Sequence, residues 1–290
     1  MAHPVIVGVD DAAGSTSAVD WAADEAQLRG TRLHLVHAWS GEPHQASGSP
    51  DASIARRWAE QALQELVARA KGRHPELEVS SGVVDVAPRE ALVALSAAAQ
   101  LLLVGSRGTG GFPGLLAGST SLHVAAHAAC PVVVVPNIGA EVPSEGSASV
   151  SMAVGVHGRE PSDELLAFAF ETAQRRRLGL RVVHAWSYPL VVGPGHAFPP
   201  VYEEGHVAAE ETRLVAEVLA GWRQKYPDVP VQEDIVRSSP AKYLVSLSAT
   251  QQLVAVGRHG TQDGPVSRLG SVSQAVVHHA RCPVAVVPLR

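Results

Sequence analysis

Short, unbroken runs of apolar residues alternate along the chain with longer segments in which apolar residues recur every three or four positions. Unbroken runs are typical of strands buried on both faces of a parallel sheet, and the wider spacing is typical of helices. In the first half the predicted strands are Val5–Val9, Leu33–Ala38, Val79–Val84, Leu101–Val104 and Val132–Val135. This alternation predicts an α/β fold, a parallel sheet with helices on both faces and right-handed crossovers.

The predicted helices cover residues 15–29, 54–71, 88–99 and 119–128. Ser15 is suited to cap the first of them, and Pro88 is suited to the first turn of the third. Gly30 and Gly72 are suited to end the first and second, because glycine adopts the left-handed conformation that terminates many helices.

The pattern occurs twice. Val7–Asp10 is repeated as Val154–His157 at an offset of 147 residues, and the later Cys130-Pro131 is repeated as Cys282-Pro283 at an offset of 152. The five additional residues are expected in the stretch 188–200, which is rich in Pro and Gly. A period of this length indicates a duplicated domain and not a solenoid.

We therefore expect two tandem domains, at 1–137 and 151–290, with a small, polar linker at 138–150. Each domain is expected to be a doubly wound unit with a five-stranded parallel sheet. The last strand of the second, Val284–Val287, is expected to end before Pro288, because proline lacks the N–H that a strand interior requires.

Composition narrows the class of protein. No apolar run approaches the roughly 18 residues of a membrane helix, and no secretory signal is visible, so a cytoplasmic protein without a membrane anchor is expected. The net charge of −5 argues against a nucleic-acid partner. The two cysteines, Cys130 and Cys282, are expected to be buried, reduced thiols and not a disulfide framework.

A glycine loop follows the fourth predicted strand of each half. The first reads Gly105-Ser-Arg-Gly108, nine residues, then Gly118-Ser119, and the second has the same spacing from Gly257. Glycines let a ligand approach the backbone closely, and the amides at a helix start attract anions. Both loops therefore suit a phosphate, although neither has the spacing of a P-loop or of a dinucleotide fingerprint.

Asp10 ends the first strand, which in a doubly wound sheet lies beside the fourth strand and its glycine loop. A carboxylate opposite a phosphate requires a bridging cation, so Mg²⁺ bound to the phosphates is expected there. The second half has His157 in place of Asp10, and Val272 in place of Thr120. The second site is therefore expected to be weaker or independent of metal.

The loop pattern G-x2-G-x9-G-[ST] resembles that of the universal stress protein family. The resemblance extends to Val-Gly-Val-Asp at the start, Val-His-Ala-Trp at the second strand and Cys-Pro-Val-Val-Val-Val-Pro at the end of the first half. It covers nearly all of both halves, as in tandem members of the actinobacterial type. It implies the strand order 3-2-1-4-5 and pairing of units through the fifth strand, which in a tandem chain can be internal.

The resemblance also implies bound ATP, with Mg²⁺ on the nucleotide. Asp10 would serve the phosphates and metal, Ala38 would meet adenine through its backbone, and Gly8 and Val9 would line the nucleoside. Ribose and phosphates would be held by Gly105, Arg107, Gly108, Gly118, Ser119 and Thr120. The matching residues of the second half are Ala185, Gly257, Gly260, Gly270, Ser271 and Val272.

Simpler interpretations of these residues stay open. Asp10 can merely begin a turn, and both glycine loops can be structural turns without a ligand. Trp39 and Trp186, at matched positions, are expected to pack and not to stack on a base. His123 and His127 are four residues apart, but no carboxylate or Cys nearby completes a metal site.

The function expected from the sequence is that of an ATP-binding regulatory protein of the stress response, with a protein partner that the sequence does not identify. One alternative is an interaction module that no longer binds nucleotide. Another is a slow Mg²⁺-dependent ATPase, although no residue stands out as a base and no G-x-S-x-G or H-E-x-x-H motif occurs. A homodimer is also compatible with internal pairing of the halves.

Overall fold

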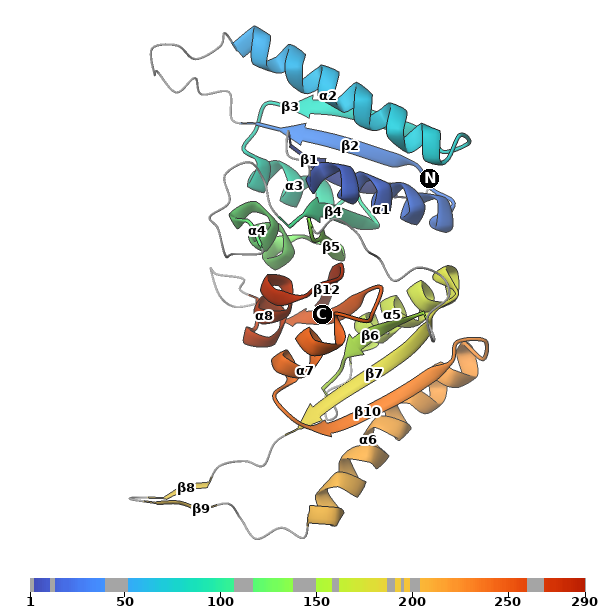
Figure 1. Ribbon diagram of the computed structural model, residues 1–290, viewed down its shortest axis with the longest axis vertical. Helices are drawn as coiled ribbons and strands as arrows, with labels where there is room; N and C mark the ends of the chain where they lie inside the picture. Colours follow the sequence, from blue (N-terminus) through green and yellow to red (C-terminus); the bar gives the residue numbers. More distant parts are fainter. Residues whose placement is uncertain are drawn as a thin grey trace.

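Ten strands of the computed structural model form one continuous sheet along the length of the molecule (Figure 1). The structure describes residues 3–10, 14–39, 52–106, 117–137, 150–157, 162–186, 191–193, 196–198, 204–259 and 269–289. The sheet consists of two similar halves, which we call unit 1 and unit 2.

Unit 1 contains the first five strands and four helices. Its strands are β1 (Val5–Val9), β2 (Leu33–Ala38), β3 (Val79–Val84), β4 (Leu101–Gly105) and β5 (Val132–Val135). Its helices are α1 (Gly14–Arg29), α2 (Ala52–Arg73), α3 (Pro88–Ser96) and α4 (Ser119–His127). The four residues of β5 are all buried valines, as an unbroken apolar run predicts.

Unit 2 repeats these elements. Its strands in the large sheet are β6 (Ser151–Gly155), β7 (Gly179–Trp186), β10 (Val231–Arg237), β11 (Val254–His259) and β12 (Val284–Leu289). Its helices are α5 (Asp163–Arg176), α6 (Glu204–Lys225), α7 (Pro240–Leu247) and α8 (Ser271–His279). The expected insertion contains a further antiparallel pair, β8 (Val191–Gly193) and β9 (His196–Phe198), which the sequence analysis did not predict.

The strand order is β3-β2-β1-β4-β5 in unit 1 and β10-β7-β6-β11-β12 in unit 2. The five strands that each unit contributes to the large sheet are parallel to one another. The expected order 3-2-1-4-5 is confirmed in both units. The units meet through their fifth strands, where β5 and β12 pair antiparallel with Val132 opposite Val286. The expected internal pairing is therefore present.

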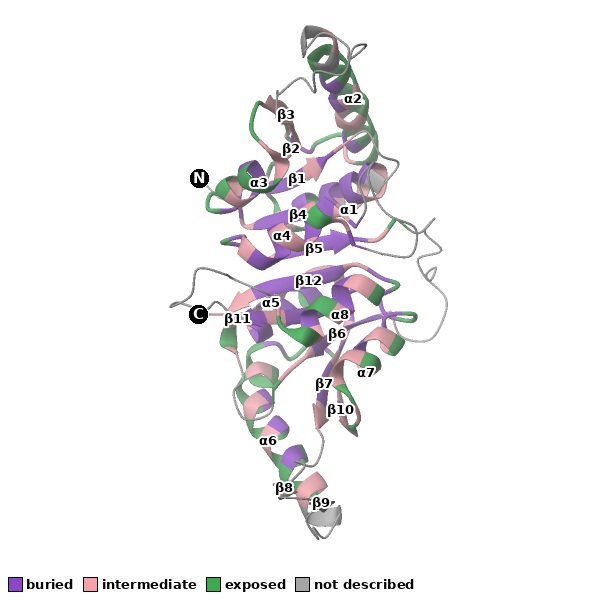
Figure 2. Ribbon diagram, turned by 90° about the vertical axis from the view of Figure 1, so that its left-hand side faces the viewer, coloured by how far each residue is buried: buried purple, intermediate pink, exposed green. Residues whose placement is uncertain are grey.

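Two apolar clusters fill the space between the sheet and its helices. The cluster on one face includes residues of α1, α2, α5 and α6, such as Val19 and Leu166. The cluster on the other face includes residues of α3, α4, α7 and α8, such as Leu92 and Leu244. Figure 2 shows that buried residues line the sheet and that exposed residues occupy the outer helix surfaces. Each cluster draws on both units, so the fold is packed as one body.

Two arginines, Arg176 and Arg258, also connect the units. Arg176 of α5 donates to the Glu25 carboxylate of α1 through Nη2 at 2.6 Å, and Glu25 also accepts from Arg29 at 2.8 Å. On the other face, Arg258 donates through Nη2 to the carbonyl of Ala128 at 2.6 Å. Burial lowers the pKa of the Arg258 guanidinium.

Several predicted ends of elements were wrong. Helix α1 begins at Gly14, so Ser15 lies in its first turn and is not its cap. Helix α2 continues through Gly72 to Arg73, whose side chain is held by Asp24 at 2.8 Å. Helix α3 ends at Ser96 and not near residue 99.

Strand β12 passes through Pro288 to Leu289. At Pro288 the strand is paired with β11 alone, because its pairing with β5 covers only Val284–Val286. A proline without an N–H is tolerated where a strand has one neighbour. Gly30 ends α1 as predicted, with a φ of 60°. The corresponding end of α5 has the non-glycine Arg177 at a φ of 54°.

Candidate functional site

The described residues of the predicted site in unit 1 converge at the carboxyl ends of three adjacent strands. Val5 to Gly8 of β1 pair in order with Leu101 to Val104 of β4, so Gly105 is level with Val9. On the other side of β1, Val9 is opposite His37, so Asp10 is level with Ala38. The strand ends expected to hold phosphate, metal and base are therefore neighbours.

Helix α4 is fastened to the end of β4. The amide of Gly118 donates to the carbonyl of Ser106 at 2.6 Å, and the hydroxyl of Ser121 donates to the carbonyl of Gly105 at 2.6 Å. No side chain caps the helix, because Gly118 is its N-cap residue. The first amides of a helix have no acceptor within it, so an anion at this end can accept from them.

Ser121 is buried and its hydroxyl is bonded to the carbonyl of Gly105, so this hydroxyl is not presented to a ligand. Its role is to position the helix. Ser119 is exposed and Thr120 is half-buried, so these two can present hydroxyls at the start of α4. Arg107 and Gly108, also expected in the site, lie outside the described residues, as does Gly260 of unit 2.

Asp10 is held by Ser15. The Ser15 hydroxyl donates to the Asp10 Oδ1 atom at 2.8 Å, and the Asp10 amide donates to Ser15 Oγ at 2.9 Å. These bonds fix the carboxylate directly after the end of β1. In unit 2 the corresponding Ser162 instead caps α5, accepting from the amide of Leu165 at 3.3 Å. The serine thus has a different partner where the acid has become His157.

Neither Gly8 nor Val9 presents a side chain to a ligand. A Cβ added to Gly8 would lie 2.7 Å from Leu92 of α3, so this glycine allows the helix to approach the strand. Gly155 has the same relation to Leu244 in unit 2, at 2.8 Å. Val9 is buried in the core. Gly8 and Val9 can therefore reach a ligand only through the backbone.

Unit 2 keeps the same frame. Ser273 donates to the carbonyl of Gly257 at 2.7 Å, as Ser121 does to Gly105, and Gly270 is the N-cap residue of α8. At the start of α8, Ser271 is exposed, and Val272 is half-buried and apolar. Unit 2 therefore keeps the hydrogen bond that fastens the helix to the strand and the glycine at the helix start. It lacks the acid and one of the hydroxyls of unit 1.

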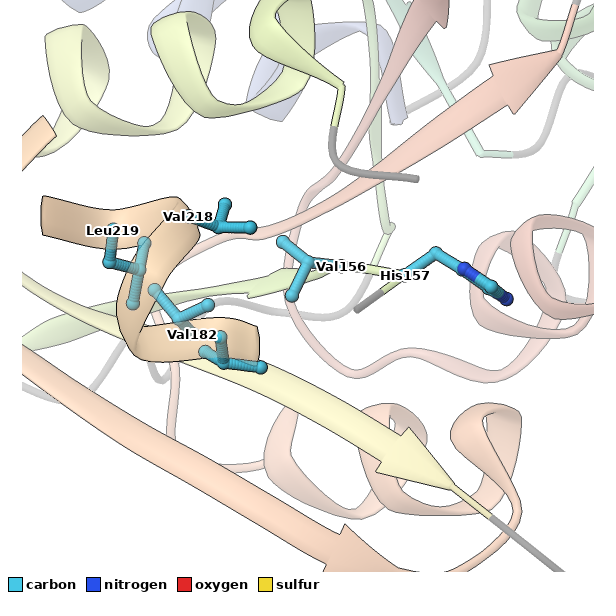
Figure 3. A pocket seen from close by; sticks show the side chains of 6 residues that line it. Val156, His157, Val182, Val218 and Leu219 are labelled. Atoms are coloured by element: carbon cyan, nitrogen blue, oxygen red, sulfur yellow. The ribbon is translucent and has the colours of Figure 1, made fainter. Parts of the chain in front are cut away.

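His157 and its neighbour Val156 point to opposite sides. Both residues line a hollow together with apolar residues of β7 and α6; Val156 turns towards these apolar side chains, and the ring of His157 is directed away from them (Figure 3). Gly155, two residues before His157, faces Leu244 of α7. Because side chains alternate along a strand, His157 lies on the face that α7 and α8 cover. The hollow itself is too narrow to hold a water molecule and is packing space.

The comparisons agree with this arrangement. The family model described as "Universal stress protein family" matches residues 1–136 and 151–288. The universal stress protein Rv2005c of Mycobacterium tuberculosis is 37% identical over 98% of this chain and 96% of its own length.

The chain belongs to the universal stress protein family.

Solved universal stress proteins are also similar to this chain. One from Archaeoglobus fulgidus matches with a TM-score of 0.71 and 17% identity, covering 98% of each chain. A universal stress protein determined in complex with cAMP is 30% identical, covers 47% of this chain and 98% of its own, and has a TM-score of 0.36. The first of these likenesses spans both units and confirms the tandem architecture.

Further polar groups of this universal stress protein, which its sequence did not predict, lie close to the strand ends. Beside Ala185, His184 contacts the Glu211 carboxylate through Nε2 at 2.9 Å, and both residues are buried. In unit 1, Trp39 Nε1 donates to Asp85 Oδ1 at 2.8 Å, so Trp39 is bonded at the rim and does not merely pack. Alignment of the two halves of the sequence places Arg237 opposite Asp85. This reversal of charge at a matched position is the signal that could have identified Asp85.

Two further observations concern the described part of the chain. No group of three His, Cys, Asp or Glu side chains there could hold a metal ion by itself. No helix among these residues is long and apolar enough to cross a membrane.

Proposed function

We propose that unit 1 binds ATP and that the protein is a nucleotide-responsive regulator within the stress response. The observation that carries this proposal is the uncapped start of α4, fastened beside β4 and one strand away from Asp10. Amides and hydroxyls at this helix start suit the phosphates, and the backbone at Ala38 suits the base. Arg107 and Gly108 would complete the loop over the phosphates.

Magnesium fits this site only in company with the nucleotide. Mg²⁺ is commonly held by one or two carboxylates, several waters and phosphate oxygens, and not by an all-protein cage. Asp10 supplies one oriented carboxylate, and the described residues contain no metal cluster. The bound ion would offset the repulsion between Asp10 and the phosphates.

Isothermal titration with Mg·ATP tests the proposal on wild type, Asp10→Ala and Gly118→Val. Gly118 has a φ of −76° and a ψ of 160°, which valine adopts without strain, so Gly118→Val removes space and does not distort the backbone. We expect Gly118→Val to abolish binding and Asp10→Ala to weaken it mainly when Mg²⁺ is present. No heat in wild type, or equal affinity in all three proteins, would contradict the proposal.

Unit 2 is proposed to bind more weakly, because His157 and Val272 replace an acid and a hydroxyl. Titration should then show one strong site per chain, and His157→Asp should strengthen the second. Two equal sites in wild type would disprove this asymmetry.

The loss of the acid and of one hydroxyl in unit 2 favours one alternative function, an interaction module that binds no nucleotide. Adding AMP and cAMP to the titration guards against choosing the wrong adenine nucleotide. A slow ATPase is distinguished by phosphate release that requires Mg²⁺ and persists after further purification.

A further inference from the structure

Three residues from three elements form a hydrogen-bonded group at the rim of unit 1. The indole Nε1 of Trp39 donates to Asp85 Oδ1 at 2.8 Å, and Nη1 of Arg56 donates to Asp85 Oδ2 at 2.9 Å. Trp39 follows β2, Asp85 follows β3 and Arg56 belongs to α2. The amide of Trp39 also donates to the carbonyl of Val84 at 3.1 Å. We call Trp39, Asp85 and Arg56 the Trp39 brace.

The brace does little for stability. The side chains of Arg56 and Asp85 are 45% and 59% exposed, and an ion pair so exposed to water contributes little to folding. The indole hydrogen bond, together with Arg56, holds the pKa of the Asp85 carboxyl below its usual range, so it accepts both bonds as an anion. The effect that remains is orientation of Trp39 and of the backbone that carries it.

That backbone is part of the proposed site. Ala38, the residue before Trp39, is level with Asp10 on the neighbouring strand. Trp39 is fixed to the strand on the opposite side, because its amide donates to Val84 of β3 and its indole N–H donates to Asp85, which follows β3. The brace therefore immobilises the chain where the base of a nucleotide would meet main-chain donors and acceptors.

Unit 2 has the same positions but a different chemistry. Trp186 pairs in register with Arg237 at the ends of β7 and β10, as Trp39 is adjacent to Asp85 in unit 1. Ala208 occupies the place of Arg56 on the long helix. An arginine side chain carries donors and no acceptor, so Arg237 does not receive an indole N–H. The two hydrogen bonds that Asp85 accepts in the Trp39 brace therefore have no equivalent among Trp186, Arg237 and Ala208 of unit 2.

We propose that the Trp39 brace positions the base-contacting backbone of unit 1 and gives this site its preference for adenine over guanine. The inference rests on the proposed nucleotide binding. The pairing edge of adenine has a donor next to an acceptor, and guanine has them in the opposite order. A rigid backbone that matches one edge rejects the other, because the mismatched groups are left unpaired, whereas a loosened backbone adapts to both.

The test compares the affinities of the full chain for Mg·ATP and Mg·GTP by isothermal titration. Trp39→Phe removes the indole donor and keeps an aromatic ring, and Asp85→Ala removes the acceptor. In both we expect the ratio of ATP to GTP affinity to fall about three- to ten-fold, the effect of losing one hydrogen bond. Asp85→Asn keeps an acceptor for Trp39 and should retain most of the selectivity, and Trp186→Phe in unit 2 should leave it unchanged.

A melting temperature close to that of wild type in each variant shows that folding is intact, and the selectivity ratio then reports on positioning. Wild type that binds ATP selectively, with Trp39→Phe and Asp85→Ala equally selective, overturns the brace and leaves the proposed function standing. Wild type that binds no nucleotide overturns both.

Discussion

Removal of the Glu25 carboxylate should lower the free energy of unfolding, because it breaks a contact between the two units. Glu25 is 1% exposed and accepts from Arg29 of its own helix and from both Nε and Nη2 of Arg176 in unit 2. The Arg176 guanidinium also lies 4.0 Å from the centre of the Trp21 ring. Unit 2 has Thr172 in the place of Glu25, so of these two matched positions only Glu25 supplies a carboxylate, and it accepts from both Arg29 and Arg176.

The magnitude follows from the burial of the arginines. The side chains of Arg29 and Arg176 are 8% and 14% exposed, so water cannot replace the lost carboxylate. Breaking a buried ion pair by removing one partner costs about 3–5 kcal/mol, because a charge is left uncompensated. For a chain of this size each kcal/mol lowers the melting temperature by roughly 2–4 °C. We therefore expect Glu25→Ala to lower it by about 6–20 °C.

Urea unfolding followed by circular dichroism measures the change in free energy directly. The control is Asp20→Ala, which breaks a pair with Arg69 whose side chains are 25% and 49% exposed, and should cost about 0–1 kcal/mol. A Glu25→Ala protein within 1 kcal/mol of wild type, or no less stable than Asp20→Ala, would refute the reasoning.

Three smaller predictions follow from local features. Arg177→Gly should stabilise the protein by about 0.5–1 kcal/mol, because Arg177 is held at a φ of 54°, where glycine has no steric cost. Cys130 and Cys282 should resist iodoacetamide at pH 8 until the protein is unfolded, since burial raises the pKa of each thiol to about 12. Burial raises the pKa of the Asp24 carboxyl, but hydrogen bonds from Arg73 and His74 outweigh it and hold this pKa below its ordinary value. The stability lost in Asp24→Asn should therefore shrink as the pH falls through the acidic range in which the carboxyl is protonated.

Each has a clear contrary result. For the first, Gly30→Ala in unit 1 is the matched control and should destabilise, since Gly30 has a φ of 60°; equal effects of both substitutions would be inconsistent with the backbone argument. Rapid alkylation of the native thiols would show that they are not buried. A stability difference for Asp24→Asn that stays constant from pH 7 to pH 3 would show that the carboxyl is not coupled to Arg73 and His74.

Strands were predicted more accurately than the ends of helices, for a physical reason. Val132–Val135 matches the predicted run to the residue, because it is apolar and lies between Pro131 and Pro136, which are unsuited to a strand interior. Val79–Val84 also matches its predicted bounds, although it contains Ser80, Ser81 and Gly82 and lies at the edge of the sheet with no buried residue. Gly72 did not end α2, because Arg73 beyond it is anchored to Asp24 of α1, and such a tertiary contact outweighs a local signal.

In the candidate site, the backbone features were predictable and the side-chain partners were not. The spacing from Gly105 to Gly118 already indicated a loop between a strand and a helix. The bond from Ser15 to Asp10 spans five residues, yet serine is also a common cap, so the sequence favoured the wrong role. Arg176 and Glu25 are 151 residues apart, and their contact depends on how the units pair.

The most direct test of nucleotide binding by unit 1 is mass spectrometry of the small molecules released when the purified protein is denatured. Wild type should release an adenine nucleotide in about equimolar amount, and Gly118→Val purified in parallel should release almost none. Wild type that releases no nucleotide, or Gly118→Val that releases as much as wild type, would contradict the account.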